Sequence, residues 1–405
     1  MHIGFDGLQL GGHFTGVQHA AARLLAALCK SLPPEDSITA VLPKDSPIST
    51  PDRPPPERAP MQLTGEYLLP KRLQQERTGF RGRARAVRTL WKDWRLESFL
   101  RRHRCDVLLE PFYTLPTRLT HPAVVCVHDL IALTHPALAS RANRLHLKRR
   151  MKRSLDVAGA IVAPTAFVRE EICRLYKLPP ERITVIPWGV SERFFQQPTD
   201  SLCDTILETY RLPRQYVLYV GAIESKKNLE ALLRAFFAAR VNSKLTHKLV
   251  IVGDLGYRSR EVHDTIHFHG MRGMVEFTGY LPTEALPAIY HRADLVCMPS
   301  KVEGFGMPVL EAQAAGVPVL ISHAPALREV AGPDMPAVDA EDLKAMRVEI
   351  EKFCTDGVER DRVGKLGRTN ARRFTWEKTA QGYRAACQQA LESFMQGKAA
   401  SQTGT

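Results

Sequence analysis

The stretch that decides the fold runs from Asp294 to Val319 and reads DLVCMPSKVEGFGMPVLEAQAAGVPV. Its first part is a short apolar run of the kind that forms a buried parallel strand. Pro308 suits the first position of a helix and Gly316 suits the end of one, so the middle part predicts a helix. The apolar VPV that follows predicts a second strand. The order of strand, loop, helix and strand is that of a βαβ unit.

The loop of this unit carries two glycines and is followed by a helix start, which together favour an anion site. Gly304 and Gly306 let the backbone approach a ligand, and the unpaired N–H groups of the first helical turn favour negative charge such as a diphosphate. Glu303 in the loop and Glu311 in the helix would then accept hydrogen bonds from ligand hydroxyls. The alternative is an ordinary glycine loop, with Glu303 solvated and Glu311 only favouring the helix N-terminus.

The rest of the chain alternates short apolar runs with helical patterns, as a doubly wound α/β sheet does. In the first half we expect strands at residues 2–5, 38–42, 107–109, 124–127, 160–163 and 184–186. In the second half we expect them at residues 217–220, 248–252, 275–277, 295–298 and 317–321. The proline-rich segment 44–60 is expected to be a surface loop, and segment 188–214, with few strand signals, is expected to link two domains.

Composition is that of a globular protein of about two domains at roughly 100–200 residues each, since the chain has 405 residues. The eight cysteines are scattered without the paired spacing of a zinc or redox site, so a reduced, cytoplasmic compartment fits best. No apolar run is long enough to span a bilayer, and a strand-like segment starts at His2 without a signal peptide. Any membrane contact is therefore expected to be peripheral.

The net charge of +13 is concentrated in two segments that are expected to be helical, Lys71–Arg104 and Arg141–Arg153. Trp91 and Trp94 interleave with the arginines of the first segment, so it could lie on the inner face of an anionic membrane. A solvated basic face is the alternative. Nucleic acid is not an expected partner, because no recognised nucleic-acid module accompanies the charge.

Two lysines stand at the start of the second half. Lys226 and Lys227 follow the strand expected at 217–220, at the carboxyl end where open α/β sheets bind ligands. Fixed cations there would stabilise negative charge on a departing nucleotide. The alternative is two solvated lysines beside a helix whose N-cap is Asn228.

Two features of the first half could also bear chemistry. Gly12 and Gly16 lie in a loop before a helix expected at 17–28, which is either a ligand loop or a plain tight turn. His128 follows the strand at 124–127 and is either structural or functional, whereas Asp129 is expected to cap the next segment. His263 and His267 share a helix face without a carboxylate ligand pattern, so no metal site is predicted.

The paired glutamates Glu303 and Glu311, with Gly-Phe-Gly between them, resemble the signature of the family 4 retaining glycosyltransferases. Further matches include ERITVIPWGV at Glu181–Val190 and RRFTWEKTAQGY at Arg372–Tyr383, and in order they cover nearly the whole chain. The resemblance implies a GT-B fold of two Rossmann-like domains facing each other across a cleft. Residues 1–190 would form the acceptor-side domain and 191–375 the nucleotide-sugar domain. Residues 376–395 would form a helix that crosses back, and 396–405 a disordered tail.

The resemblance also implies roles for particular residues. Glu311 would accept ribose hydroxyls, and the sugar would be held by Glu303 and by the backbone of Gly304, Phe305, Gly306 and Met307. The phosphates would be bound by Lys226 and Lys227, the base by backbone between Thr278 and Leu281, and the transferred sugar by His128 from the other domain. Gly12 and Gly16 would line the donor and acceptor space. Lys226 departs from the family pattern, in which arginine is common and can make a bidentate contact that lysine cannot.

The resemblance therefore implies a retaining glycosyltransferase that moves a sugar, with mannose from GDP-mannose a frequent case, from a nucleoside diphosphate to a hydroxyl acceptor. His128, Glu303 and Lys227 would be its catalytic residues, without a cofactor or an obligatory metal. The family setting implies a saccharide or lipid-linked saccharide acceptor in the assembly of surface polysaccharide or lipopolysaccharide. The alternatives are a GT-B nucleotide-sugar epimerase and a non-catalytic nucleotide-sugar-binding scaffold at the membrane.

Overall fold

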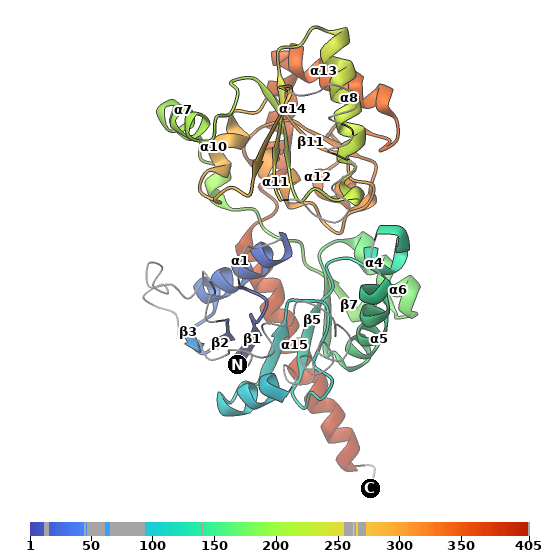
Figure 1. The fold of residues 1–405 in the computed structure, drawn as a ribbon. Coiled ribbons are helices and arrows are strands. Elements are labelled where there is room, and N and C mark those ends of the chain that lie inside the picture. The colour runs from blue at the N-terminus through green and yellow to red at the C-terminus, as the bar shows by residue number, and fades with distance from the viewer. Residues whose placement is uncertain are drawn as a thin grey trace, which may run out of the picture. The chain divides into compact units, whose positions relative to one another are not determined.

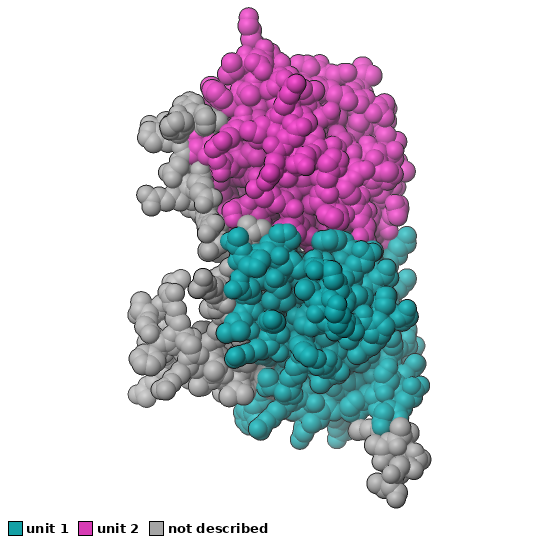
Figure 2. Space-filling model, turned by 90° about the vertical axis from the view of Figure 1, so that its right-hand side faces the viewer, with its two compact units in different colours: residues 1–187, 376–405 teal, residues 188–375 magenta. Residues whose placement is uncertain are grey.

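The computed structural model describes residues 1–11, 16–43, 46, 61–64, 94–138, 141–254, 262, 265 and 273–403. The chain divides into two compact units, which Figure 2 colours separately. Unit 1 comprises Met1–Pro187 and Trp376–Thr405, and unit 2 comprises Trp188–Thr375. Unit 2 is thus inserted into the sequence of unit 1. The chain passes from unit 1 into unit 2 after Pro187, rather than after residue 190 as expected, and segment 188–214 belongs to unit 2.

The described strands of unit 1 form a seven-stranded sheet in the order β3-β2-β1-β4-β5-β6-β7, and every neighbouring pair is parallel. The strands are β1 (His2–Asp6), β2 (Ser37–Val41), β3 (Met61–Thr64), β4 (Val107–Glu110), β5 (Ala123–Cys126), β6 (Ala160–Ala163) and β7 (Ile183–Val185). The helices of this unit include α1 (Gly16–Ser31), α4 (Ile131–Thr134), η2 (Pro136–Leu138), α5 (Arg141–Val157), α6 (Ala166–Tyr176), η3 (Pro180–Arg182) and α15 (Trp376–Thr403).

The described strands of unit 2 form a six-stranded parallel sheet in the order β10-β9-β8-β11-β12-β13. The strands are β8 (Tyr216–Val220), β9 (Lys248–Val252), β10 (Val275–Gly279), β11 (Leu295–Met298), β12 (Val319–Ser322) and β13 (Ala337–Val338). The helices of this unit include η4 (Glu192–Phe194), α7 (Asp200–Thr209), η5 (Ser225–Lys227), α8 (Leu229–Asn242), α10 (Leu286–His291), α11 (Met307–Ala314), α12 (Pro325–Ala331), α13 (Leu343–Thr355) and α14 (Gly357–Ala371).

These two sheets confirm the expected doubly wound α/β class, and each expected strand lies within two residues of an observed one. Most strands are buried on both faces, which explains their continuous apolar sequences. In unit 2, α8 packs with α13, and α11 packs with α12 and α14 (Figure 1). Strands β3 and β13 were not predicted from the sequence. Both are short, and β13 has only two residues.

The last helix, α15, completes unit 1 although it follows unit 2 in the sequence. It packs against α1 and against strands β4, β5 and β6. Helix α15 lies so close to Gly159, just before β6, that a Cβ atom added to this glycine would be 2.8 Å from the Cα of Ala390. Arg384 also donates to the buried carboxylate of Asp36 (2.6 Å). The helix continues to Thr403, beyond residue 395, where a disordered tail was expected to begin.

The strand order defines one topological switch point in each unit, where open α/β sheets form a crevice. In unit 2, β8 lies between β9 and β11, so the connections that follow β8 and β11 leave toward opposite faces of the sheet. Open α/β sheets bind ligands at such a switch point, outside the carboxyl ends of the strands. In unit 1 the corresponding point lies between β1 and β4.

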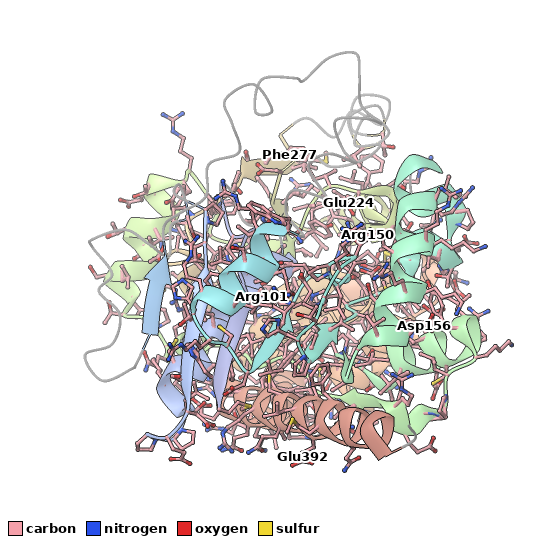
Figure 3. All side chains as sticks on the ribbon, turned by 90° about the horizontal axis from the view of Figure 1, so that it is seen from below. Arg101, Arg150, Asp156, Glu224, Phe277 and Glu392 are labelled. Carbon is pink, nitrogen blue, oxygen red and sulfur yellow. The ribbon has the colours of Figure 1, made fainter. Side chains whose placement is uncertain are left out.

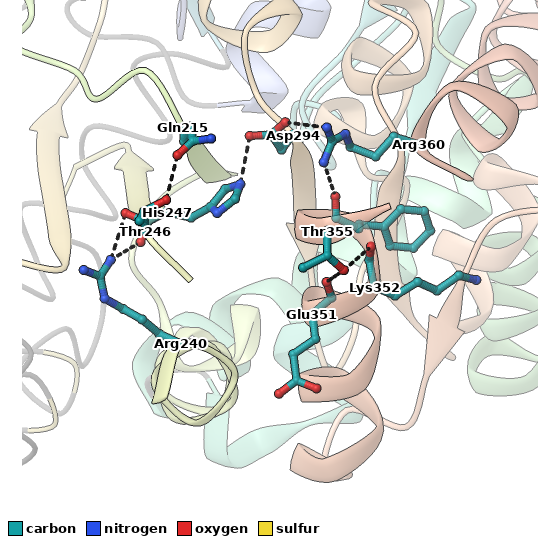
Figure 4. Close-up of polar contacts among 10 residues, drawn as sticks. Gln215, Arg240, Thr246, His247, Asp294, Glu351, Lys352, Thr355 and Arg360 are labelled. Carbon is teal, nitrogen blue, oxygen red and sulfur yellow. Dashed lines mark hydrogen bonds and ion pairs between the residues drawn. The ribbon is translucent and has the colours of Figure 1, made fainter. Parts of the chain in front are cut away.

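The amino ends of the unit 2 strands are joined by a separate polar network, drawn in Figure 4. Asp294, just before β11, accepts from His247 Nε2 at 3.1 Å and pairs with Arg360 Nη2 at 3.4 Å. Arg360 also donates to the carbonyl of Phe353 (2.8 Å). The network links β9, β11, α13 and α14 at the edge opposite the switch-point loops, so it stabilises the unit rather than forming part of that crevice.

Candidate active site

The loops after β8 and β11 contact each other at the switch point of unit 2. Lys227 Nζ lies 2.5 Å from Glu303 Oε1, and both side chains are largely buried. The backbone N–H of Lys301 donates to the carbonyl of Lys226 at 2.8 Å. The structure therefore brings together a lysine and a glutamate that are 76 residues apart in the sequence. Low exposure makes this pair electrostatically stronger than a surface ion pair.

Asn228 fixes the first of these loops in a way the sequence did not indicate. It occupies the N-cap position of α8, as expected, but its side chain makes no capping hydrogen bond. Its φ of 58° is left-handed, and its amide donates to the carbonyls of Pro299 (3.2 Å) and Ala340 (2.6 Å). Asparagine tolerates this backbone conformation better than most residues. Asn228 thus joins the ends of three neighbouring loops.

The second loop ends at a helix start that requires glycine. Helix α11 begins at Met307, one residue before the expected start at Pro308, and Gly306 precedes it with φ 102°. A Cβ atom at Gly306 would lie 2.5 Å from Leu327 Cδ2. Phe305 is buried and packs edge-on against Phe374, with ring centroids 6.3 Å apart. The loop is therefore held in one conformation at the N-terminus of the helix, where N–H groups favour an anion.

Glu311 lies in the second turn of α11 and is buried. Its Oε2 accepts a hydrogen bond from the hydroxyl of Tyr290 at 3.0 Å. Tyr290 belongs to α10, which packs against α11. A buried carboxylate without such partners would be strongly destabilising. Tyr290 thus stabilises Glu311 in the interior of unit 2.

Lys226 has a different environment from Lys227. Its Nζ lies 3.3 Å from Glu224 Oε2 within the same loop, and both side chains are partly exposed. Behind the loop, the hydroxyl of Tyr219 donates to the carbonyl of Ala222 (2.9 Å). Burial, with the nearby charge of Glu303, raises the pKa of Tyr219 well above its usual value, so this hydroxyl stays protonated and remains a donor.

The segment expected to hold a base, Thr278 to Leu281, lies at the same carboxyl edge two strands away from β8. The N–H of Gly253 donates to the carbonyl of Gly279 at 3.0 Å, and the N–H of Gly221 donates to Val252 at 2.9 Å. A Cβ atom at Gly253 would lie 2.1 Å from the carbonyl oxygen of Gly221, so the loops can approach this closely only with glycine. Leu281 is buried, and Thr278 is half-buried with its hydroxyl bonded to backbone carbonyls.

In unit 1, His128 is buried after β5 and bonded to the backbone. Its Nε2 lies 2.5 Å from the carbonyl oxygen of Pro111, so this nitrogen carries the proton and donates. Burial lowers the pKa of His128, with the Pro111 hydrogen bond and Asp129 acting in the opposite direction. The ring packs edge-on against Tyr113, with centroids 5.1 Å apart. His128 is therefore a neutral imidazole near pH 7.

Carboxylates at the ends of β1, β4 and β5 each accept the N–H two residues further on. Asp6 accepts from Leu8 (3.0 Å), Glu110 from Phe112 (2.9 Å) and Asp129 from Ile131 (3.0 Å). The last of these contacts reaches Ile131, the first residue of α4, but the N-cap position belongs to Leu130, so Asp129 supports the helix start from one residue before the expected cap. These carboxylates fix the turns that follow the strands.

The basic segments are only partly described. In the first, residues 94–102 are helical, Trp94 is exposed, and Arg101 pairs with Glu97 (3.0 Å). In α5, the predicted helix of the second segment, Arg150 donates to the carbonyl of Leu115 (3.0 Å). Figure 3 labels Arg101 and Arg150 among the side chains of unit 1. Most charged groups of the described part of α5 remain exposed.

Several predicted residues cannot be placed. Gly12, His263, His267 and the segment 71–93 lie outside the described residues, whereas Gly16 begins α1 with open space around it. No cluster of three potential metal ligands occurs among the described residues. Of the helices that can be examined in the described part of the chain, none is both long and apolar enough to cross a bilayer.

Sequence reasoning missed the role of Asn228 and overlooked Tyr290 and Tyr113. Tyr290 lies in LPAIYHRADL, which looks like an ordinary buried helix and strand start, and nothing in its spacing indicates a contact with a residue 21 positions later. Tyr113 carries a signal only in the structure, as a non-glycine residue with φ 65°. Its hydroxyl donates to Asp129 at 3.0 Å, beside His128.

Comparisons with known proteins identify the family. A sequence profile described as "Glycosyl transferases group 1" matches residues 209–370, and one described as "Glycosyltransferase Family 4" matches residues 22–194. The chain is 30% identical to the O-antigen chain mannosyltransferase B of Escherichia coli over 279 residues, which is 69% of this chain and 73% of that protein.

Solved structures share the fold. The structure of WaaG, a glycosyltransferase involved in lipopolysaccharide biosynthesis, has a TM-score of 0.69 at 17% identity, covering 95% of this chain and 98% of that one. Anabaena Alr3699/HepE in complex with UDP-glucose has a TM-score of 0.69 at 16% identity, covering 94% of this chain and 97% of that one. These similarities confirm the expected GT-B fold. The chain belongs to the group 1 glycosyltransferases, and it is a glycosyltransferase in which Lys227 and Glu303 meet at the β8–β11 switch point.

Proposed function

We propose that this enzyme transfers a sugar, with retention of anomeric configuration, from a nucleoside diphosphate to a hydroxyl acceptor. The observation that carries the proposal is the Lys227–Glu303 pair at 2.5 Å, in the crevice between β8 and β11 and beside the N-terminus of α11. Cations and backbone N–H groups at one point suit a diphosphate, and carboxylates next to them suit hydroxyl groups.

In this proposal each part of the crevice binds one part of the donor. Lys226, Lys227 and the start of α11 hold the phosphates, and Glu311 accepts from ribose hydroxyls. Glu303 and the backbone of residues 304–307 hold the sugar, and the segment from Thr278 to Leu281 holds the base. His128 of unit 1 contacts the transferred sugar as a neutral hydrogen-bonding group.

The chemical step needs no group beyond these. The acceptor oxygen bonds to the anomeric carbon on the face from which the phosphate departs, and the bond from that carbon to the phosphate oxygen breaks. The departing phosphate takes the proton of the acceptor hydroxyl. Lys227 lies where it would stabilise the negative charge that grows on that phosphate, which is the main catalytic contribution we assign to it.

The donor sugar we propose is mannose, carried by GDP, and the acceptor is a growing surface saccharide or lipid-linked saccharide. The similarity to an O-antigen chain mannosyltransferase supports both assignments. We further propose that the enzyme acts in the cytoplasm, on the inner face of the membrane. Peripheral contact through Lys71–Arg104 is supported by the exposed Trp94 and by exposed arginines at 101, 102 and 104.

A ligand titration tests the donor site. Thermal unfolding is followed with GDP-mannose, UDP-glucose and ADP-glucose, with and without EDTA, because a ligand that binds the native state raises the Tm. We expect one base to raise the Tm without dependence on EDTA. Glu311→Ala should remove the shift, whereas Glu230→Ala, on an exposed face of α8 where Glu230 pairs with Arg234, should keep it. No shift with any donor would overturn the assignment of the site.

A second assay separates transfer from the alternatives. A transferase releases nucleoside diphosphate only when acceptor is present, and the new glycosidic bond keeps the anomeric configuration of the donor. An epimerase changes the donor sugar without an acceptor, and a scaffold binds the donor without changing it. NMR of the products with and without a saccharide acceptor distinguishes the three.

A further inference from the structure

The side chain of Tyr290 reaches Glu311 from the neighbouring helix α10. Its hydroxyl is 3.0 Å from Glu311 Oε2, and the tyrosine has no exposed surface. A carboxylate can only accept, so the phenol donates to it. This contact fixes one of the two carboxylate oxygens, and with it the rotation of the group.

Tyr290 is itself held from several sides. Its ring packs edge-on against Phe194, with centroids 5.5 Å apart and planes at 86°. The carbonyl of Ile289, the residue before it, accepts a hydrogen bond from the hydroxyl of Tyr216 (2.6 Å). The residue after it, His291, donates through Nε2 to the carbonyl of Phe194 (3.0 Å). The hydroxyl of Tyr290 therefore has little freedom to follow Glu311 to another position.

We propose that Tyr290 is a positioning residue that orients Glu311 to accept hydrogen bonds from the ribose of the donor. The inference rests on the proposed function, in which Glu311 binds those hydroxyls. A glutamate side chain has several rotatable bonds, and ordering it only when the ligand binds would weaken affinity. With Tyr290 in place, that ordering is complete before the nucleotide arrives.

The test compares two buried tyrosines. Tyr290→Phe removes the hydroxyl that contacts Glu311 and keeps the ring. Tyr383→Phe removes an equally buried hydroxyl, which lies in unit 1 and contacts the sulfur of Cys126 instead (2.9 Å). Dissociation constants are measured by calorimetry for GDP and for 2′,3′-dideoxy-GDP, or for the matching pair of the base that the thermal titration selects.

We expect wild type and Tyr383→Phe to bind the complete nucleotide about tenfold more tightly than the dideoxy form, the effect of a charge-assisted hydrogen bond. In Tyr290→Phe this ratio should fall to about twofold. The KM for the sugar nucleotide should rise while kcat at saturating donor changes little. A wild-type ratio in Tyr290→Phe would overturn the positioning role.

Two further variants keep the outcome decisive. If Glu311→Ala keeps the full ratio, the proposed contact between Glu311 and ribose fails, and the inference fails with it. If Glu311→Ala loses the ratio but Tyr290→Phe does not, only the inference fails. Should Tyr290→Phe not fold, Phe194→Leu can replace it, because this change removes the ring that packs against Tyr290 and keeps the Tyr290 hydroxyl and the Glu311 carboxylate. It should lower the ratio by a smaller factor, and no change would contradict the proposal.

Discussion

The two switch-point crevices of this chain use charge in opposite ways. In unit 2, charged side chains from separate loops meet one another, as Lys227 meets Glu303. In unit 1, Asp6 and Glu110 bind backbone two residues away, and His128 binds the carbonyl of Pro111. A lysine and a glutamate that pair with each other can each pair with a charged or polar group of a ligand instead. Side chains that bind nearby backbone fix the shape of their loops. We therefore expect donor chemistry to depend on unit 2 and geometry to depend on unit 1.

The largest expected effect comes from removing the buried cation of unit 2. Lys227→Met should lower kcat by about 100- to 1000-fold, the usual cost of removing one group that stabilises transition-state charge. The effect is measured as acceptor-dependent release of nucleoside diphosphate at saturating donor. Lys248→Met, which removes a lysine paired with Glu276 at the amino end of β9, is the control and should change kcat by less than about twofold. Similar losses in both variants would contradict the comparison.

A smaller effect is expected from unit 1. His128→Ala should lower kcat by about tenfold, corresponding to one hydrogen bond, and should change donor affinity less. The two constants are separated by measuring kcat and the dissociation constant of the donor in parallel. His121→Ala, which removes a partly exposed histidine beside Glu97, should leave both unchanged. Equal losses of kcat and donor affinity in His128→Ala would contradict the division of roles between the units.

Alanine substitutions at two glycines, one in each unit, compare how strongly the backbone of the two loops is constrained. Gly306→Ala combines a left-handed φ of 102° with a Cβ atom 2.5 Å from Leu327, and should lower the free energy of unfolding by about 1–3 kcal/mol. Gly16→Ala in unit 1 meets open space at the start of α1, and should stabilise by up to about 0.5–1 kcal/mol. Urea unfolding measures both. Equal destabilisation would show that the two loops are equally constrained.

The smallest expected effect is a pH dependence from His128. Burial lowers its folded pKa below 6.5, so its contribution to stability is complete above pH 6.5 and is lost as the pH falls toward the folded pKa. The loss should not exceed about 1.4 kcal/mol per pH unit, the value for one proton. Urea unfolding at pH 7.5 and below 6 measures it, and His128→Gln should reduce the difference. Because burial also lowers the pKa values of His2 and His291, part of the difference should remain.

Much of the fold could be predicted because buried parallel strands leave continuous apolar runs. Strands β6, β9 and β11 begin and end at the expected residues. The loop from Glu303 to Gly306 could be predicted as a site because its glycines and carboxylates lie within a few residues of one another. The two-residue strand β13 carries too little sequence for a periodic signal.

The rest of the site depends on contacts that sequence spacing does not determine. The switch point exists only once β11 pairs with β8, and the loop residues Lys227 and Glu303 meet as a result of that pairing. The hydrogen bonds that the Asn228 amide donates go to carbonyls 71 and 112 residues away in the sequence. Tyr290 looked like a core residue and is one, and its contact with Glu311 follows from the packing of α10 on α11.

The placement of α15 has a consequence for the order in which the chain acquires its structure during synthesis. Unit 2 is one continuous stretch, so every residue that it needs has been translated once Thr375 is added. At that moment unit 1 still lacks α15. The surfaces that Tyr383 and Arg384 contact stay uncovered until those residues leave the ribosome. The first unit to be translated is therefore the last to be finished. Truncation after residue 375 should leave unit 2 folded and unit 1 prone to aggregate.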